Sequence, residues 1–350
     1  MTPLRVGING LGRVGLSMAG LAVLRARDPD HPCIARSHRS VQLVAIRDER
    51  SIDELADRLR HRWPAPMWHG DVRTRAGQLC IDDHPVAVLS VSSGEPAPWV
   101  DAGVEVVVGG GWPGATPGPP PLERGRYTVV LGGEARADAT IVPGANDSDL
   151  AYENAVVVSA AGPCEHAFAP VLAALHRAFG VRWASVAHTL ALDPAQPTHE
   201  RLDGHELLDT RSGPANIVPR PTDALGATLA VLPDLAGRIE VTKAHVPVMA
   251  GSMFSITCTL ADAVDIDRVL TMFGDAATNG PLRGIIRVAP RPMVSGDVVG
   301  DPSSCVIDPQ LCRRLGPFLR VGGWFDENTG YAARLLDLAA VLGANRREPA

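Results

Sequence analysis

The sequence predicts an α/β protein with an N-terminal Rossmann dinucleotide-binding domain and a second, α+β domain with a mixed or antiparallel sheet. Three observations lead to this prediction. The chain has 350 residues, which suits two domains of ordinary size. Its N-terminal part alternates short apolar strand patterns with helical ones. The first strand pattern, Leu4–Asn9, leads directly into the glycine motif Gly10-Leu11-Gly12-Arg13-Val14-Gly15.

Periodicity and turn residues indicate the elements of the N-terminal domain. Ser51–Arg62 is expected to be a helix in which Ser51 is the N-cap and Glu54 completes a capping box. Trp112–Gly125 is rich in Gly and Pro and is expected to be a loop. The other expected elements are a helix at Val14–Arg27, a strand pair over Gln78–Leu89, and strands at Leu4–Asn9, Val41–Ile46, Val104–Val108, Tyr127–Leu131 and Ala155–Ser159. This alternation is typical of a doubly wound parallel sheet.

The pattern changes after a long apolar helix expected at Ala167–Phe179. Longer strands are then expected at Val181–Ala191, Glu240–Val248, Phe254–Leu260 and Gly284–Val288, with helices at Ile266–Ala276 and Gly330–Leu342. We therefore predict an NAD-binding domain at residues 1–162 and a catalytic domain at 163–329. Residues 330–350 are expected to form a helix that returns to the NAD-binding domain.

Composition excludes several classes of partner. A net charge of −6 provides no basic field for nucleic acid. The sequence has no run of 18 apolar residues, so no transmembrane helix is expected, and the N-terminus enters a strand pattern without a signal peptide. The six cysteines form no CxxC pair, which favours free thiols in a reducing cytoplasm over disulfides or a metal site.

The glycine motif follows a strand and opens a helix, which is the context of a dinucleotide site. Gly10 permits the tight turn, Gly12 lets the backbone approach a pyrophosphate, and Gly15 lets the helix pack on the strand. The diphosphate would bind amides at the helix N-terminus, so the candidate residues are Asn9, Gly10, Gly12, Arg13, Val14 and Gly15. The alternative is a glycine-rich turn that holds no ligand.

Asp48 ends the second expected strand and is the candidate that selects the cofactor. An acid at this place can bond both hydroxyls of the adenosine ribose and repel a 2′-phosphate, so we expect NAD. Arg47 and Arg50 flank Asp48 and would soften this preference. A solvated acid in a turn is the alternative interpretation of Asp48.

The run from Val6 to Gly15 resembles the opening of the glyceraldehyde-3-phosphate dehydrogenase family almost residue for residue. Further resemblances follow in the family's order along nearly the whole chain: Ala102-Gly103-Val104-Glu105, Ala137-Asp138-Ala139, Gly144-Ala145-Asn146, Ala169-Pro170, His188, Asn216-Ile217-Val218-Pro219, Val246-Pro247, Gly280-Pro281-Leu282 and Trp324-Phe325-Asp326. The resemblance implies the family's fold, NAD as cofactor, a small-molecule substrate and a homotetramer. The family's nicotinamide-holding asparagine corresponds to Glu327, and Asn328 stands one residue later.

The departures from the family concern its chemistry. Pro163 occupies the position of the nucleophilic cysteine, and Cys164 follows it. Pro163 suits the first position of a helix, which would place Cys164 where the helix lowers a thiol pKa, while Glu165 opposes that effect. Cys164 is thus either a nucleophile or an inert thiol. His188 matches the family's general base, with a core histidine as the alternative, and His166 is a second candidate acid or base.

The family's phosphate-binding positions have also changed. Ala191 corresponds to its threonine, and His245 to its arginine. Thr222 matches another threonine, and Arg211 and Arg220 lie in the intervening loop outside the family's register. Loss of a fixed guanidinium weakens bidentate binding of phosphate. The candidate substrate residues are therefore Thr222, Arg211 and His245.

Three hypotheses of function follow. The first is an NAD-dependent aldehyde oxidoreductase with a substrate other than, or additional to, glyceraldehyde 3-phosphate, in which Cys164 forms a thioester and His188 is the base. The second is a repurposed biosynthetic enzyme that keeps the cofactor and His188 but forms no thioester. The third is a non-catalytic NAD-binding protein.

Overall fold

The computed structural model describes residues 3–27, 40–61, 71–75, 77–82, 84–91, 95–109, 128–132, 137–146, 157–201, 207–220 and 224–345. The expected loop Trp112–Gly125 and the candidate Thr222 lie outside these residues. Contacts within the chain divide it into two units, Met1–Gly162 with Tyr331–Ala350, and Pro163–Gly330. The described helices show no segment long and apolar enough to cross a membrane.

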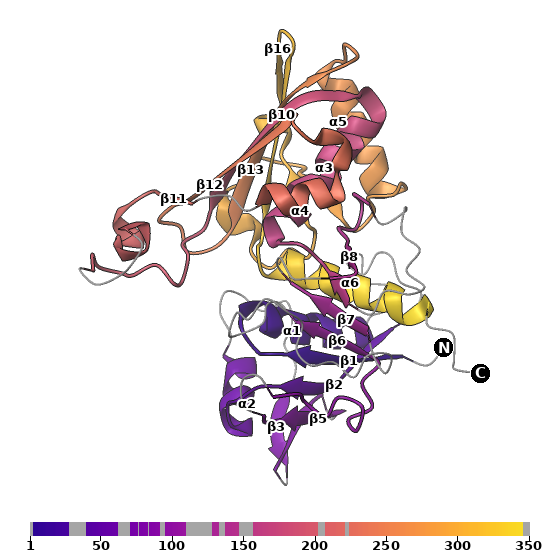
Figure 1. Ribbon diagram of the computed structural model, residues 1–350, viewed down its shortest axis with the longest axis vertical. Coiled ribbons are helices and arrows are strands. Elements are labelled where there is room, and N and C mark those ends of the chain that lie inside the picture. The colour runs from indigo at the N-terminus through magenta and orange to yellow at the C-terminus, as the bar shows by residue number, and fades with distance from the viewer. Residues whose placement is uncertain are drawn as a thin grey trace. The chain divides into compact units, whose positions relative to one another are not determined.

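The first unit is built on a largely parallel sheet in the strand order β3-β4-β5-β2-β1-β6-β7-β9-β8 (Figure 1). Its central strand, β1, pairs in parallel with β2 on one side and β6 on the other. The strands are β1 Leu4–Asn9, β2 Val41–Arg47, β3 Val72–Arg75, β4 Gln78–Ile81, β5 His84–Leu89, β6 Val106–Gly109, β7 Thr128–Leu131, β8 Ala139–Thr140 and β9 Val157–Ser159. This arrangement confirms the predicted Rossmann-type sheet.

Among the described residues, three helices belong to this unit: α1 Arg13–Arg27, α2 Ile52–Arg60 and α6 Thr329–Asn345. The capping box at the start of α2 is confirmed, because Ser51 accepts a hydrogen bond from the Glu54 amide and the Glu54 carboxylate accepts one from the Ser51 amide. Leu4, Val6 and Ile8 of β1 are fully buried among apolar residues of α1 and α6. The return of the C-terminal helix to this unit therefore completes its core.

A buried ionic cluster fastens α6 to α1. The Arg25 guanidinium lies 2.7 Å from Asp337 Oδ1 and donates a second hydrogen bond to the Ala333 carbonyl. Arg334, which is 0% exposed, donates to the other Asp337 oxygen at 2.7 Å. One carboxylate thus serves two buried guanidinium groups, and its loss would leave both without their counter-charge.

The second unit contains a mixed sheet in the order β11-β12-β10-β13-β17-β15-β14, with β16 paired to β17. Its strands are β10 Val181–Leu190, β11 Val218–Arg220, β12 Ile239–His245, β13 Ser252–Leu260, β14 Ile286–Val288, β15 Cys305–Ile307, β16 Arg313–Leu315 and β17 Phe318–Phe325. Its helices are α3 Pro163–Phe179, α4 Ala224–Val231 and α5 Ile266–Thr278. The predicted α+β class is confirmed, because β10 pairs in parallel with β12 and antiparallel with β13.

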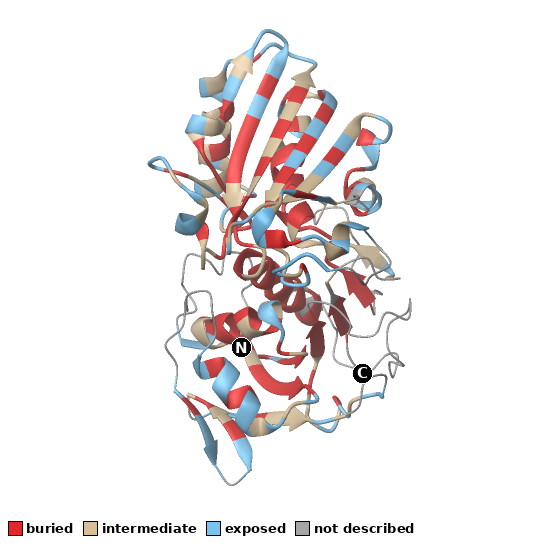
Figure 2. Ribbon diagram, turned by 90° about the vertical axis from the view of Figure 1, so that its left-hand side faces the viewer, coloured by how far each residue is buried: buried red, intermediate tan, exposed pale blue. Residues whose placement is uncertain are grey.

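One face of this sheet is buried beneath α3, which packs on β10 and β13. Figure 2 shows buried and exposed residues alternating along the strands. On β10 the side chains of Ala184, Val186 and His188 are buried, whereas Ser185 and Ala187 between them are exposed. The strand therefore presents His188 to the covered face of the sheet.

Several expected bounds were wrong. Helix α3 begins at Pro163 rather than Ala167, strand β12 ends at His245 rather than Val248, and β14 is shorter than Gly284–Val288. Strand β17 was missed because Gly322 and Gly323 interrupt its apolar pattern. These glycines permit close packing instead of a turn, since a Cβ at Gly322 would lie 2.7 Å from the Leu311 Cβ.

We expect Asp337→Asn to lower the free energy of unfolding by about 3–5 kcal/mol, because it leaves Arg25 and Arg334 buried without a full counter-charge. Urea denaturation followed by circular dichroism measures this change. Asp57→Asn is the control, since the ion pair of Asp57 with Arg60 is exposed and contributes less than about 1 kcal/mol. Equal effects of the two variants would contradict the structural role of the buried cluster.

Candidate active site

The glycine motif forms the turn between β1 and α1. Gly10 has a φ of +86°, a conformation that other residues rarely adopt, and its amide donates to the Arg47 carbonyl at 2.8 Å. A side chain at Gly15 would overlap the Gly10 carbonyl oxygen. Arg13 and Val14 open α1, so the first-turn amides of this helix follow the glycine turn directly.

Asn9 is the last residue of β1 and lies beside this turn. Its side chain is buried, and neither its amide nitrogen nor its oxygen has a hydrogen-bond partner among the described residues. Gly109, at the end of the neighbouring strand β6, lies directly beside it, because a Cβ there would be in van der Waals contact with Asn9, 3.5 Å from its Cβ. A buried amide of this kind fits a bound polar ligand, so the residues present suit a dinucleotide.

Asp48 lies directly after β2, as expected, but its carboxylate is already engaged. One oxygen accepts a hydrogen bond from the Leu11 amide at 2.8 Å, and the Arg50 guanidinium donates to both oxygens at 2.7 Å. Burial opposes ionisation of Asp48, but these hydrogen bonds outweigh it and lower the pKa of the carboxyl. Asp48 therefore also anchors the glycine turn, a second role beyond the one predicted for it.

Cys164 lies in the first turn of α3, as the position of Pro163 predicts. The chain enters this helix through Ala161, whose φ of +50° is unusual for a residue other than glycine. Cys164 is 6% exposed. Burial raises the pKa of Cys164 to about 12, and nearby Glu165 and Glu327 act in the same direction while Lys243 opposes them.

His188 stands in the middle of β10 within an aromatic enclosure. Its ring centroid lies 5.3 Å from that of Phe168 and 6.1 Å from that of Phe325, both in edge-to-face arrangements. Burial and the charge of Lys243 lower the pKa of His188 to about 3. The carbonyl groups of Cys164 and Thr242 partly offset this shift, although neither forms a hydrogen bond of ordinary geometry with the ring. His188 is therefore a neutral imidazole at physiological pH, able to accept a proton.

Lys243 lies beside His188, because the two residues are register partners on the parallel strands β12 and β10. Its ammonium is 4.0 Å from the Glu165 carboxylate on the first turn of α3. The Lys243 side chain is 19% exposed, whereas that of Glu165 is 4% exposed. Lys243 thus brings a positive charge to the cluster of Cys164 and His188.

Glu327 lies just beyond β17 and is held at the end of β10. Its carboxylate accepts hydrogen bonds from the Ala191 amide at 3.3 Å and from the Ser252 hydroxyl. The Ser252 hydroxyl also accepts from the Ala191 amide at 2.8 Å. On the other side of Ala191, the His245 imidazole lies 2.5 Å from its carbonyl oxygen. A carboxylate therefore lies against the backbone amide of Ala191.

The structure does not gather every predicted residue at this cluster. His166 is buried in α3, two residues after Cys164. Arg211 pairs with Glu200 at 2.8 Å, a contact within its own loop. Arg220 is likewise bound within that region, to Gln196 at 2.7 Å. The Asn328 amide donates to Asp326 at the end of β17.

Sequence reasoning missed Lys243 and Ser252. Composition contained a signal for the first, because Lys243 is the only lysine in the chain. Ser252 carries no comparable signal, since serines are common on exposed strands.

Among the described residues no group of His, Cys, Asp and Glu is arranged to hold a metal ion, and the cysteines found there are free.

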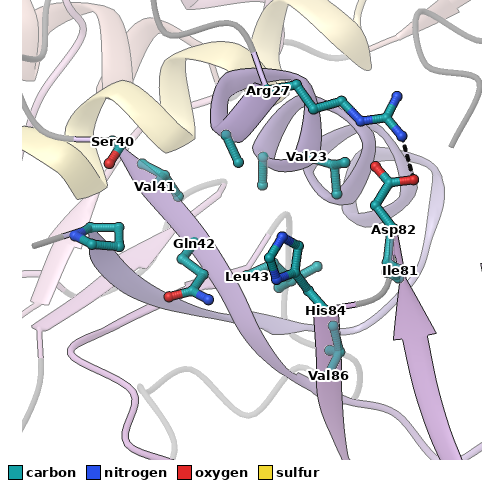
Figure 3. Close-up of a pocket in the computed structure, with 13 residues that line it drawn as sticks. Val23, Arg27, Ser40, Val41, Gln42, Leu43, Ile81, Asp82, His84 and Val86 are labelled. Carbon is teal, nitrogen blue, oxygen red and sulfur yellow. Dashed lines mark ion pairs between the residues drawn. The ribbon is translucent and has the colours of Figure 1, made fainter.

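A separate cavity of about 320 Å³ lies in the first unit between the end of α1, the start of β2 and the β4–β5 hairpin (Figure 3). Arg27 and Asp82 form an ion pair at its edge. The cavity adjoins Val41 at the N-terminal end of β2, whereas Asp48 and the glycine turn lie at the carboxyl ends of the strands. Ligands of open α/β sheets bind at the carboxyl ends, so this cavity is distinct from the dinucleotide site.

Comparison with known proteins agrees with both halves of this description. Residues 4–111 match the glyceraldehyde 3-phosphate dehydrogenase NAD binding domain, and residues 164–327 match the glyceraldehyde 3-phosphate dehydrogenase C-terminal domain. The chain is 30% identical over 344 residues to glyceraldehyde-3-phosphate dehydrogenase 2 of Streptomyces arenae, covering 97% of this chain and 99% of that protein. It is 31% identical over 352 residues to glyceraldehyde-3-phosphate dehydrogenase of Mycobacterium leprae, covering 97% of this chain and 98% of the relative.

These matches extend over nearly the whole chain and include the domain that binds NAD. The glycine turn, the neutral histidine of β10 and the mixed sheet lie within the matched regions. The chain therefore belongs to the glyceraldehyde-3-phosphate dehydrogenase family, as an NAD-dependent oxidoreductase.

Proposed function

We propose that this enzyme converts a small aldehyde that carries no phosphate group, with NAD as cofactor. The observation that carries the proposal is the position of Glu327, whose carboxylate is bound to the Ala191 amide and the Ser252 hydroxyl. A phosphate held at this amide would meet a like charge. Two unit charges about 4 Å apart repel by roughly 4 kcal/mol near a protein surface, which is enough to exclude such a substrate.

The neighbouring side chains support this substrate class. Neither Ala191 nor His245 supplies a guanidinium, and the His245 imidazole is already engaged by a carbonyl oxygen. Two carboxylates, Glu165 and Glu327, and one ammonium, Lys243, act on Cys164. The fixed charges of the cluster thus sum to one negative charge with His188 neutral, which disfavours a dianionic group.

We assign the cofactor to the glycine turn of the first unit, with Gly10–Gly15 and Asn9 toward its phosphates and Asp48 toward its ribose. Bound NAD supplies a hydride acceptor or donor at its nicotinamide ring. We assign the proton acceptor of the reacting centre to His188 from its position beside Cys164 and Lys243; its lowered pKa of about 3 keeps the imidazole neutral and makes it a weak base in the free protein.

One route would pass through Cys164. In this route Cys164 Sγ bonds to the aldehyde carbon while His188 takes the thiol proton. The bound cofactor would supply the hydride acceptor for that carbon, and Cys164 would then carry a thioester that water or another acceptor would cleave. The amides of the first turn of α3 would stabilise the oxyanion.

A second route, without a thioester, is favoured by the burial of Cys164. The pKa of this thiol is about 12, so it is protonated at neutral pH, and only 6% of the residue is exposed. An uncharged, covered thiol is a poor nucleophile. His188 would then exchange a proton with the substrate directly, and no bond between Cys164 and the substrate would form.

We also infer a homo-oligomer, for which the resemblance implies a tetramer. The uncovered side of the second sheet carries a row of register partners, Trp183, Thr259 and Phe318, with Leu315 paired to Phe318. Trp183 is 61% exposed, and Phe318 is 51% exposed. A second copy of the chain would cover this apolar row.

Glu327→Gln is expected to admit phosphate at this end of β10, because it removes the charge but keeps a hydrogen-bonding group near Ala191 and Ser252. Competitive inhibition of the NAD-linked reaction by inorganic phosphate should strengthen by about tenfold or more, which is about 1.4 kcal/mol. Glu327→Asp retains the charge and should leave inhibition weak. Equal inhibition of all three proteins would refute the proposed exclusion of phosphate.

Cys164 is expected to react slowly with iodoacetamide at pH 7. An ordinary cysteine, with a pKa of 9.0, holds about a thousand times more thiolate than one at about 12. Peptide mapping by mass spectrometry gives the rate, and the same protein in denaturant provides the unhindered reference. Rapid, selective labelling of Cys164 together with complete loss of turnover in Cys164→Ser would instead establish the thioester route.

Asp48→Ala should weaken NAD binding about tenfold, because it removes the acceptor for the ribose hydroxyls. Isothermal titration calorimetry measures the affinity. Asp48→Asn is the matched variant, since it keeps an acceptor for the Leu11 amide and so preserves the glycine turn. If both variants bound NAD as tightly as the unaltered protein, the adenosine ribose would not lie at Asp48.

A further inference from the structure

Four hydrogen bonds occupy the carboxylate of Asp48. Arg50 Nε donates to Oδ1 and Arg50 Nη2 donates to Oδ2, each at 2.7 Å, which makes a bidentate ion pair. The Leu11 amide donates to Oδ2 at 2.8 Å, and the Arg50 amide donates to Oδ1 at 3.2 Å. A carboxylate offers about four lone-pair sites, so these bonds use the acceptors that ribose hydroxyls would need.

The same guanidinium lies at the glycine turn. Its Nη2 also donates to the carbonyl of Leu11, the residue between Gly10 and Gly12, at 3.3 Å. The Arg50 side chain is 30% exposed, whereas that of Asp48 is 6% exposed. The guanidinium therefore has room to turn toward a ligand from solvent, while the Leu11 amide still holds the buried carboxylate.

Arg50 is the better placed of the two arginines that flank Asp48. Arg47 is 3% exposed and donates to the Val91 carbonyl at 3.3 Å. Its guanidinium is thus enclosed by protein. The partly exposed side chain of Arg50 is the one that a ligand at the end of β2 would meet.

The other acids near Arg50 hold it less firmly than Asp48 does. Glu49 and Glu54 act on the guanidinium through their charge, whereas Asp48 also accepts hydrogen bonds from it. The Glu54 carboxylate is bound instead to the Ser51 amide at 3.0 Å and to the Ser51 hydroxyl at 2.8 Å. Asp48 is therefore the anion that Arg50 would exchange for another.

A carboxylate and a guanidinium at the end of this strand favour different dinucleotides. An acid there bonds to the 2′-hydroxyl of NAD, whereas a nearby arginine accommodates the 2′-phosphate of NADP. A guanidinium binds phosphate and carboxylate alike, through two parallel hydrogen bonds. This chain has both side chains at the site, and each is the other's partner.

We propose that Arg50 determines cofactor specificity by binding the 2′-phosphate of NADP, so that this enzyme accepts NADP as well as NAD. Toward NAD, Asp48 exchanges hydrogen bonds from Arg50 for bonds from the ribose hydroxyls. Toward NADP, Arg50 turns from Asp48 to the phosphate, and its positive charge offsets the repulsion by the carboxylate. The proposal rests on the placement of the adenosine ribose at Asp48 and on no step of the reaction.

Isothermal titration calorimetry of the full-length protein with oxidised NAD and with NADP measures both affinities without turnover. Because Arg50 compensates the charge of Asp48, we expect the Kd for NADP to be at most about tenfold above the Kd for NAD. A larger ratio in the unaltered protein would overturn the proposal.

Arg50→Gln should change the two affinities in a way that separates the cofactors. It removes the partner of the phosphate, so NADP should bind at least about tenfold more weakly. It also frees acceptors on Asp48, so NAD should bind as tightly as before or more tightly. Arg58→Gln is the matched control, because it removes the same charge from an exposed position on the neighbouring helix α2 and should leave both affinities unchanged.

Equal weakening of NAD and NADP binding in Arg50→Gln would overturn the proposal and leave Arg50 as a support of the glycine turn. An unchanged ratio of the two Kd values would overturn it as well. Failure of the cofactor site itself gives a different result, because the unaltered protein would then bind neither dinucleotide.

Discussion

The pairing of β10 with β12 beneath α3 is the constraint on which the reacting centre depends. Parallel register places His188 and Lys243 side by side, and the covering helix brings Cys164 and Glu165 to them from its first turn. The same face of the sheet must therefore accommodate a histidine, an ammonium, a thiol and a carboxylate in a largely apolar setting. Burial at this face determines the protonation states of Cys164 and His188 more than the residue types alone do.

Burial acts on these groups in opposite directions. It keeps the Cys164 thiol protonated and the His188 imidazole uncharged, because each group avoids its charged form away from water. The Lys243 ammonium lies 4.0 Å from the Glu165 carboxylate, and Glu327 adds a further carboxylate bound to Ala191. The result is a neutral imidazole next to an ammonium, in a cluster that holds two carboxylates.

Much of the fold was predictable because its signals are local. The glycine turn after β1 and the capping box of α2 each depend on a few adjacent residues. Strand β17 was not predictable from the sequence, because the reason for Gly322 and Gly323 lies in the segments that pack against them. The contacts of Lys243 with Glu165, and of Glu327 with Ser252, join residues distant in sequence. No periodicity encodes such contacts.

The most direct test is the initial rate of NADH formation by the unaltered protein, measured with glyceraldehyde and with glyceraldehyde 3-phosphate at equal concentrations. If the carboxylate at Ala191 has replaced an anion site, the unphosphorylated aldehyde has the higher kcat/KM. A kcat/KM for the phosphate ester that exceeds it tenfold or more would show that this chain still binds phosphate, and would contradict the role assigned to Glu327.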